Sequence, residues 1–223
     1  MADIFQSKAA FGEHLSQFTL ADGAGVMVRE RADDALAIVT ARRGMAAELA
    51  KRVKAMGIVL PSGPRRKAQG SLAFLGIGPG RWLATLDHGA NTSQSRDAWT
   101  KSLAHDLAGC ASVVDQTGGY AVLQISGAKA LATLAKGVAI DLHPHAFRAG
   151  DVAVTQIAQI GVMLWQLDDQ PTYAISVFRS LAGSFWHWLS VGAEEFGIAV
   201  AGAAGPDWSS VQRRVVQQQP PKS

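Results

Sequence analysis

The chain contains 223 residues, a length that allows either one elaborated domain or two compact halves. Hydrophobic residues make up 48% and charged residues 17%, which excludes a disordered protein, because disorder needs low hydrophobicity and high charge. The net charge of +3 is too small an excess to favour nucleic-acid binding. A free monomer normally covers itself with charged residues, so the low charge predicts that a partner subunit covers part of the surface.

The sequence carries few signals for export, cross-linking or membrane insertion. Cys110 is the only cysteine, which excludes an internal disulfide bond and a multi-cysteine zinc site and fits a reducing compartment. The first eight residues lack the basic and apolar regions of a signal peptide. The apolar runs at 157–167 and 197–204 are shorter than the roughly 20 residues that span a bilayer. We therefore expect a cytoplasmic protein without a membrane partner.

The chain divides into four predicted segments. Residues 1–23 lack a clean hydrophobic period and predict an N-terminal arm that lies on the body or on a neighbour. Residues 24–110 and 111–200 predict an N-terminal and a C-terminal half. The residues from 201 to 223, rich in glutamine and proline near their end, predict a mobile tail.

Within the N-terminal half, pairs of β-type runs alternate with helical periodicity. The predicted elements are a hairpin of strands 26–28 and 36–39, a helix over 45–56, strands 72–77 and 82–86, and a helix with Ser93 or Ser95 as its N-cap.

The C-terminal half contains more strands. The predicted elements are strands 113–115 and 120–125, a helix over 127–136 capped by Ser126, strands 152–160 and 162–167 separated by Gly161, strand 172–178, and a helix from Ser180 to Gly197. Because strands come in adjacent pairs, the sequence predicts an α+β fold of two compact halves, with largely antiparallel sheets and helices packed on one side.

Each motif that could carry chemistry has a simpler structural explanation. The glycine-rich segment 76–80 predicts a tight turn and not a dinucleotide site, because Pro79 lacks an N–H donor and a strand pattern follows. His143 and His145 could share a metal ion, but no further ligands show a recognisable spacing, which favours structural histidines. No pair of carboxylates or nucleophile motif indicates acid/base or covalent catalysis. We therefore predict no catalytic, cofactor-binding or metal-binding residue in this chain.

Aromatic residues suggest where a partner would bind. A helix cannot bury all four side chains of 185–188 (Phe-Trp-His-Trp) on one face, so this segment forms either a subunit contact or an elaborate core. Aromatic residues and arginine are enriched at protein interfaces. The predicted interface residues are Phe147, Arg179, Phe185, Trp186 and Trp188.

Four segments together carry a resemblance to a known family. Residues 113–127 (VVDQTGGYAVLQISG), 134–147 (LAKGVAIDLHPHAF), 78–83 (GPGRWL) and 178–180 (FRS) resemble the gamma subunit of heterotetrameric sarcosine oxidase. The resemblance is clear over residues 70–197 and looser from residue 20. It implies an assembly with alpha, beta and delta subunits that oxidises sarcosine with oxygen to glycine and hydrogen peroxide, passing the methyl carbon to tetrahydrofolate.

The same resemblance implies how the work is divided among the subunits. FAD, FMN, NAD, zinc and tetrahydrofolate would be held by the other subunits, and this chain would be noncatalytic and would stabilise the assembly. Two alternatives remain open: a gamma-type subunit of a related complex such as N-methylglutamate dehydrogenase, and a stand-alone folate-binding aminomethyltransferase-like protein.

A more distant similarity, to the folate-binding aminomethyltransferase of the glycine-cleavage system, implies the same fold. Anchored on residues 142–144, that family's functional aspartate falls near Val138, with Asp141 close but displaced. Its asparagine-rich turn falls at 158–162. Because an apolar residue cannot hold a folate amine by charge or hydrogen bond, the scaffold would be kept and the chemistry lost.

Overall fold

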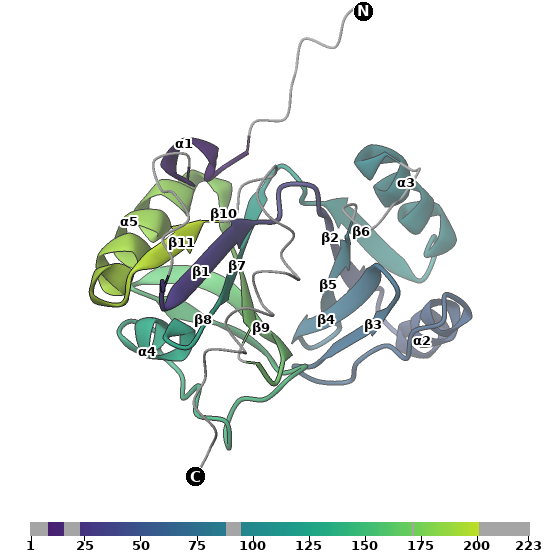
Figure 1. Cartoon of the computed structure of the whole chain (residues 1–223). Helices are drawn as coiled ribbons and strands as arrows, with labels where there is room; N and C mark the ends of the chain where they lie inside the picture. Colours follow the sequence, from purple (N-terminus) through teal and green to yellow (C-terminus); the bar gives the residue numbers. More distant parts are fainter. Residues whose placement is uncertain (1–8, 16–22, 88–94, 171, 201–223) are drawn as a thin grey trace, which may run out of the picture.

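The computed structural model describes residues 9–15, 23–87, 95–170 and 172–200, which form two β-sheets and the helices that cover them (Figure 1). The six-stranded sheet has the order β11-β1-β7-β10-β9-β8, and the five-stranded sheet has the order β3-β4-β5-β2-β6. The strands of the first are β1 (Val26–Glu30), β7 (Tyr120–Ser126), β8 (Val152–Ile157), β9 (Ile160–Asp168), β10 (Thr172–Phe178) and β11 (Ile198–Val200). Those of the second are β2 (Ala35–Ala41), β3 (Arg66–Gln69), β4 (Leu72–Gly78), β5 (Arg81–Leu86) and β6 (Ala111–Asp115).

The helices cover the outer faces of the two sheets, which gives a four-layer arrangement with both sheets in the middle (Figure 1). On the six-stranded sheet these are α1 (Gly12–Leu15), α4 (Ala130–Ala135) and α5 (Ala182–Ala193), and on the five-stranded sheet α2 (Ala46–Ala55) and α3 (Arg96–Asp106). Short 3-10 turns, η2 (Arg179–Leu181) and η3 (Glu194–Phe196), flank α5. The predicted α+β class with helices on one side of each sheet is confirmed.

Both faces of the central strands are buried, which explains their nearly continuous apolar runs. In β7, Ala121, Leu123 and Ile125 face the helices, while Val122 faces the other sheet. In β2, Ala35, Ala37 and Val39 face α2 and α3, and Leu36 and Ile38 point between the sheets. One layer of apolar side chains therefore joins the two sheets back to back.

The predicted hairpin at 26–39 and the predicted boundary near residue 110 are both wrong. The strand β1 pairs with β7 and β11 in the six-stranded sheet, whereas β2 pairs with β5 and β6 in the five-stranded sheet. Each sheet thus takes one strand from the other half of the sequence. The hydrophobic pattern identifies strands but not their partners, and so it could not show this exchange.

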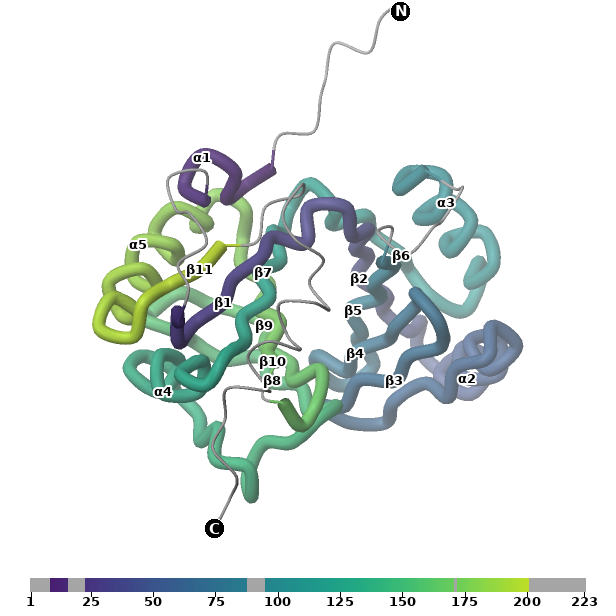
Figure 2. Tube along the Cα trace, in the orientation of Figure 1, coloured from purple at the N-terminus to yellow at the C-terminus, as the bar shows by residue number. Residues whose placement is uncertain are grey.

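The chain crosses between the sheets at two neighbouring segments. Residues 31–34 lead from β1 to β2, over the arch that Figure 2 shows, and residues 116–119 lead back from β6 to β7. The N–H of Gln116 donates to the carbonyl of Leu36 over 2.8 Å, and the N–H of Leu36 donates to Thr117 Oγ1 over 3.0 Å. These bonds join the return crossing to the start of β2.

Several predicted elements agree with the structure, and some ends differ. Ser95 caps α3, with its Oγ accepting the N–H of Ala98, and the hairpin β4–β5 forms as expected. The predicted helix 127–136 is shorter, because Ser126 lies within β7 and Lys129 is the N-cap. The turn between β8 and β9 lies at Ala158 and Gln159, whose φ angles are 48° and 67°, two positions before the predicted break at Gly161.

The arm predicted at residues 1–23 is described only at residues 9–15 and 23. There Phe11 and Leu15 pack into the core beside α5, so this part of the arm lies on the body of its own chain. The tail predicted from residue 201, together with residues 1–8 and 16–22, lies outside the described residues.

The two sheets also meet at a seam, where the segment before β3 joins the segment before β8. Arg65 and Asp151 form an antiparallel bridge, and the N–H of Val152 donates to the carbonyl of Pro64 over 2.9 Å. On the other side of this segment, the backbone of Gly63 lies directly against Gly76 of β4, and a Cβ on Gly76 would overlap the Gly63 carbonyl oxygen. The seam therefore depends on glycine at position 76.

We expect Gly76→Ala to lower the free energy of unfolding by about 1 to 3 kcal/mol, since either the side chain or the Gly63 segment must move. Gly78→Ala is the matched control on the same strand, because a Cβ there meets no atom within 4 Å. Urea denaturation of both variants measures the difference. Equal stability of the two variants would contradict this account of the seam.

Candidate functional site

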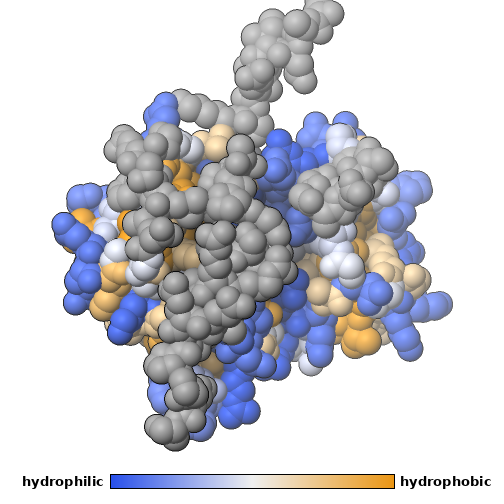
Figure 3. Space-filling model, in the orientation of Figure 1, coloured by the Kyte–Doolittle hydropathy of each residue, from blue (hydrophilic) through white to orange (hydrophobic). Residues whose placement is uncertain are grey.

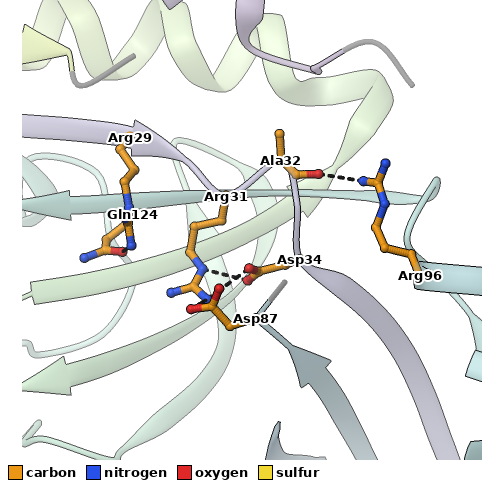
Figure 4. Close-up of polar contacts among 7 residues, drawn as sticks. All are labelled: Arg29, Arg31, Ala32, Asp34, Asp87, Arg96 and Gln124. Carbon is orange, nitrogen blue, oxygen red and sulfur yellow. Dashed lines mark hydrogen bonds and ion pairs between the residues drawn. The ribbon is translucent and has the colours of Figure 1, made fainter. Parts of the chain in front are cut away.

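A buried cluster of charges occupies the crossing from β1 to β2 (Figure 4). The guanidinium of Arg31 donates to both carboxylate oxygens of Asp34, over 2.6 and 3.0 Å, and contacts Asp87 Oδ2 at 2.9 Å. Asp34 is 7% exposed. We call Arg31, Asp34 and Asp87 the crossover cluster. Sequence patterns missed it, because the polar residues 29–34 are also typical of a surface turn.

Burial and ion pairing shift the pKa values of Asp34 and Arg31 in opposite directions. Burial raises the pKa of Asp34 to about 6, although the charge of Arg31 pulls it down. Burial lowers the pKa of Arg31, but Asp34 and Asp87 outweigh it, and the pKa ends above its ordinary value. Arg31 therefore stays charged, while Asp34 takes up a proton in mildly acidic solution.

Further arginines surround the crossover cluster. Arg29 donates from Nη2 to Gln124 Oε1 over 2.9 Å, and Arg96 donates from Nη1 to the carbonyl oxygen of Ala32 over 2.7 Å (Figure 4). Burial and the neighbouring charge of Arg31 lower the pKa of both Arg29 and Arg66. The first bond joins β1 to β7, and the second joins α3 to the crossing segment.

A small polar pocket opens beside the crossover cluster. Its lining includes Glu30, Arg31, Arg96, Tyr120 and Arg179. Glu30 accepts the backbone N–H groups of Ala10 and Phe11 over 2.7 and 3.1 Å. The bonds to Glu30 hold the N-terminal segment against β1, and the bonds from Arg31 to Asp34 hold the crossing in place.

The two histidines with potential for metal binding lie together on the surface. The rings of His143 and His145 are 4.9 Å apart, and His143 Nδ1 accepts the N–H of His145 over 3.3 Å. Within the ranges that the structure describes, no group of three or more metal-binding side chains comes together. The pair therefore stabilises the local turn, together with Asp141, whose Oδ1 accepts the N–H of His143 over 2.8 Å.

The two segments that correspond to the folate-related positions lie side by side. Val138 forms a bridge with Ile157, and the N–H of Ala158 donates to the carbonyl of Gly137 over 3.0 Å. Val138 packs against the core of the six-stranded sheet, while Asp141 is exposed and bonded to His143. The side chain of Val138, near which the sequence alignment puts the transferase aspartate, is therefore an apolar one that packs against the core.

The predicted interface residues fall into two groups. Phe147, Phe185 and Trp186 are 6%, 0% and 5% exposed and belong to the core of their own chain, so the prediction is wrong for them. One face of α5 buries both Phe185 and Trp186, and His187 points to solvent. Trp188 is half-buried against Gly137, and Arg179 is half-buried beside the polar pocket. An interface role for these two residues stays a prediction.

A second hollow, which we call the seam groove, lies beside the meeting point of the two sheets. Its volume is about 360 Å³, and its lining consists of Pro61–Pro64, Gly76–Gly80, Trp82 and Val154. Trp82 forms a fixed wall, because its Nε1–H donates to the carbonyl oxygen of Pro61 over 2.8 Å. Apolar atoms and backbone dominate this surface, and a dinucleotide-binding loop at 76–80 is absent because the segment forms the β4–β5 turn.

Exposed apolar residues are scattered over the described surface. On the face shown in Figure 3, hydrophobic residues form small separate patches among hydrophilic ones. The large exposed apolar residues are Val59, Val114, Val154, Phe178 and Val191, with Val59 at 68% and Val154 at 62%. Within the described residues, no helix has the length and apolar character needed to cross a membrane.

Comparison with known proteins identifies the family. The model of the sarcosine oxidase gamma subunit family matches residues 39–195. The sarcosine oxidase subunit gamma of an Arthrobacter species is 31% identical over 191 residues, covering 82% of this chain and 89% of that protein. The chain belongs to the sarcosine oxidase gamma subunit family. A second family member, from Corynebacterium sp. (strain P-1), is 32% identical over 124 residues, covering 56% of this chain and 58% of that protein.

Solved structures agree with this assignment. A chain of the heterotetrameric sarcosine oxidase from Corynebacterium sp. U-96, in complex with pyrrole 2-carboxylate, superposes with a TM-score of 0.73 and 25% identity, covering 87% of this chain and 98% of that one. The aminomethyltransferase T of Bartonella henselae superposes with a TM-score of 0.59 and 16% identity, covering 88% of this chain and 52% of that one. The gamma subunit family thus shares its fold with the transferase.

The pKa of Asp34 makes the stability of the chain depend on pH. Its folded value of about 6 exceeds the ordinary 3.8, so the folded chain binds the proton more tightly than the unfolded chain. This contribution is complete below pH 3.8 and is lost as the pH rises through 6. The difference between the two pKa values corresponds to at most about 3 kcal/mol.

We expect Asp34→Asn to remove this component from the pH profile of the free energy of unfolding, measured by urea denaturation from acidic to neutral pH. Asp33→Asn is the control, because Asp33 is the exposed neighbour. If all three proteins had parallel profiles, the proton would not bind at Asp34.

The burial of Trp186 gives a second prediction. Trp186→Ala should lower the free energy of unfolding of the separate chain by about 3 to 5 kcal/mol, because it leaves a cavity in the core. His187→Ala, on the exposed side of the same helix, should change it by less than about 0.5 kcal/mol. Thermal denaturation distinguishes the two variants. An unchanged midpoint for Trp186→Ala would contradict the burial of Trp186 in the core.

Proposed function

We propose that this chain is a noncatalytic subunit that stabilises a heterotetrameric sarcosine oxidase with alpha, beta and delta subunits. In this proposal the other subunits hold FAD, FMN, NAD, zinc and tetrahydrofolate. The complex oxidises sarcosine with oxygen to glycine and hydrogen peroxide, and transfers the methyl carbon to tetrahydrofolate in the cytoplasm. The observation that carries the proposal is the 31% identity that extends over 89% of an Arthrobacter gamma subunit.

The local chemistry supports a structural role. In the sequence alignment the transferase aspartate falls near Val138, and the side chain of Val138 packs against the core. The buried carboxylate Asp34 is engaged by Arg31, and the half-buried Glu30 by two backbone N–H groups. These groups stabilise the crossing between the sheets and the N-terminal segment beside it, which is a structural role.

The likeness in fold to the aminomethyltransferase does not favour a stand-alone folate-binding transferase, because only the fold is shared at 16% identity. The relatives compared above are sarcosine oxidase gamma subunits, which favours sarcosine over N-methylglutamate as the substrate of the complex.

Co-expression with the other subunits of the same oxidase tests the proposal. We expect all the chains to elute together in size-exclusion chromatography and to produce hydrogen peroxide with sarcosine, and the complex to be lost when this chain is omitted. The purified chain alone should neither bind tetrahydrofolate in calorimetry nor consume oxygen with sarcosine or N-methylglutamate. Turnover by the isolated chain, or normal assembly in its absence, would contradict the proposal.

A further inference from the structure

The strand β8 is an edge strand whose middle is open. Its hydrogen bonds to β9 leave alternate residues pointing outwards. At one end, the N–H of Val152 donates outwards to the carbonyl of Pro64 over 2.9 Å. At the other end, the carbonyl of Gln156 accepts the N–H of Ala139 over 3.0 Å. Val154 lies midway between them, so its N–H and C=O also point away from the sheet, and no described residue bonds to them.

The side chain of Val154 makes this edge a binding surface. It is 62% exposed and lines the seam groove with Pro61 and Trp82. Unpaired edge groups next to an apolar hollow offer both backbone hydrogen bonds and a place for a side chain. The sequence of β8, VAVTQI, contains neither a charged residue nor proline, which are the usual devices against edge pairing.

The dimensions of the opening restrict what can bind. The bridges from Arg65 to Asp151 and from Val138 to Ile157 close the two ends of the edge. Only residues 153–156 remain available, which suits a short extended segment and not another sheet. Trp82, held by its hydrogen bond to Pro61, forms one wall of the groove. The space beside this wall can accept an apolar side chain.

One exposed basic residue adjoins the lining of the seam groove in the sequence. Arg81 lies between the lining residues Gly80 and Trp82, is exposed, and has no ion pair with the described residues. Asp151, the carboxylate at the other end, is already bound to Arg65 and to the N–H of Arg148. A binding segment with a carboxylate near Arg81 would therefore complement the groove.

We propose that the seam groove binds a short extended segment of another subunit of the oxidase. The segment adds a strand to β8 through the backbone of Val154, places an apolar side chain against Trp82, and presents a carboxylate to Arg81. The inference rests on the proposed function, because it requires that this chain be a subunit of the complex. It adds the surface and the chemistry of the partner.

The test uses the complex purified after co-expression. Val154→Asp should weaken association of this chain with the other subunits by at least about tenfold, since interface anchors commonly cost that much. Val191→Asp is the matched control, because Val191 is 58% exposed on α5, outside the groove. Arg81→Glu should also weaken association, and Arg81→Lys should retain most of it.

Amide hydrogen exchange supplies a readout that needs no variant. The N–H of Val154 should exchange quickly in the free chain and become protected in the complex, whereas the amides of exposed loop residues such as Ala32 and Asp33 should be unchanged. This measurement tests whether the Val154 edge is covered in the complex, even if Val154→Asp fails to fold.

The outcomes separate the two proposals. If the wild-type chain joins no complex, the proposed function and the groove proposal both fail. If the wild-type chain assembles, but Val154→Asp assembles equally well and the Val154 amide stays unprotected, the groove proposal alone fails. Protection of Val154 together with selective loss of binding in Val154→Asp and Arg81→Glu supports it.

Discussion

The structure depends on a buried ion pair at the point where the chain passes from one sheet to the other. Arg31 and Asp34 lie between strands that belong to different sheets, and Asp87, just after β5, adds a second carboxylate. Buried charges are costly unless they are paired, so this segment can take up few conformations. The bidentate contact between Arg31 and Asp34 spans the crossing and restricts its conformation. The return crossing at 116–119 is bonded to it through Leu36.

These crossings make the two halves of the sequence inseparable. Because β1 and β6 are exchanged, neither sheet is complete without a strand from the other half. The apolar layer between the sheets and the seam at Arg65 and Asp151 add further contacts. The two sheets therefore depend on each other for their completion.

The aminomethyltransferase T of Bartonella henselae shares the fold of this chain. The segments around Val138 and Ala158 meet through backbone pairing, and the side chain of Val138 packs against the core. Backbone pairing preserves the fold independently of that side chain. The apolar seam groove and its open β-edge are surfaces on which the proposed role in assembly can act.

The sequence by itself determined most helices and strands and the largely antiparallel character of the sheets through its hydrophobic pattern, and four segments of it resemble the family. Ser95 as a helix cap and the turn at Gly78–Gly80 follow from local chemistry, which needs no distant partner. Only the tertiary structure decided that β1 and β2 separate, that Asp34 is buried against Arg31, and that Phe185 and Trp186 belong to the core. The physical reason is that pairing and burial depend on residues far apart in the chain, such as Leu36 and Thr117, whose proximity no local pattern encodes.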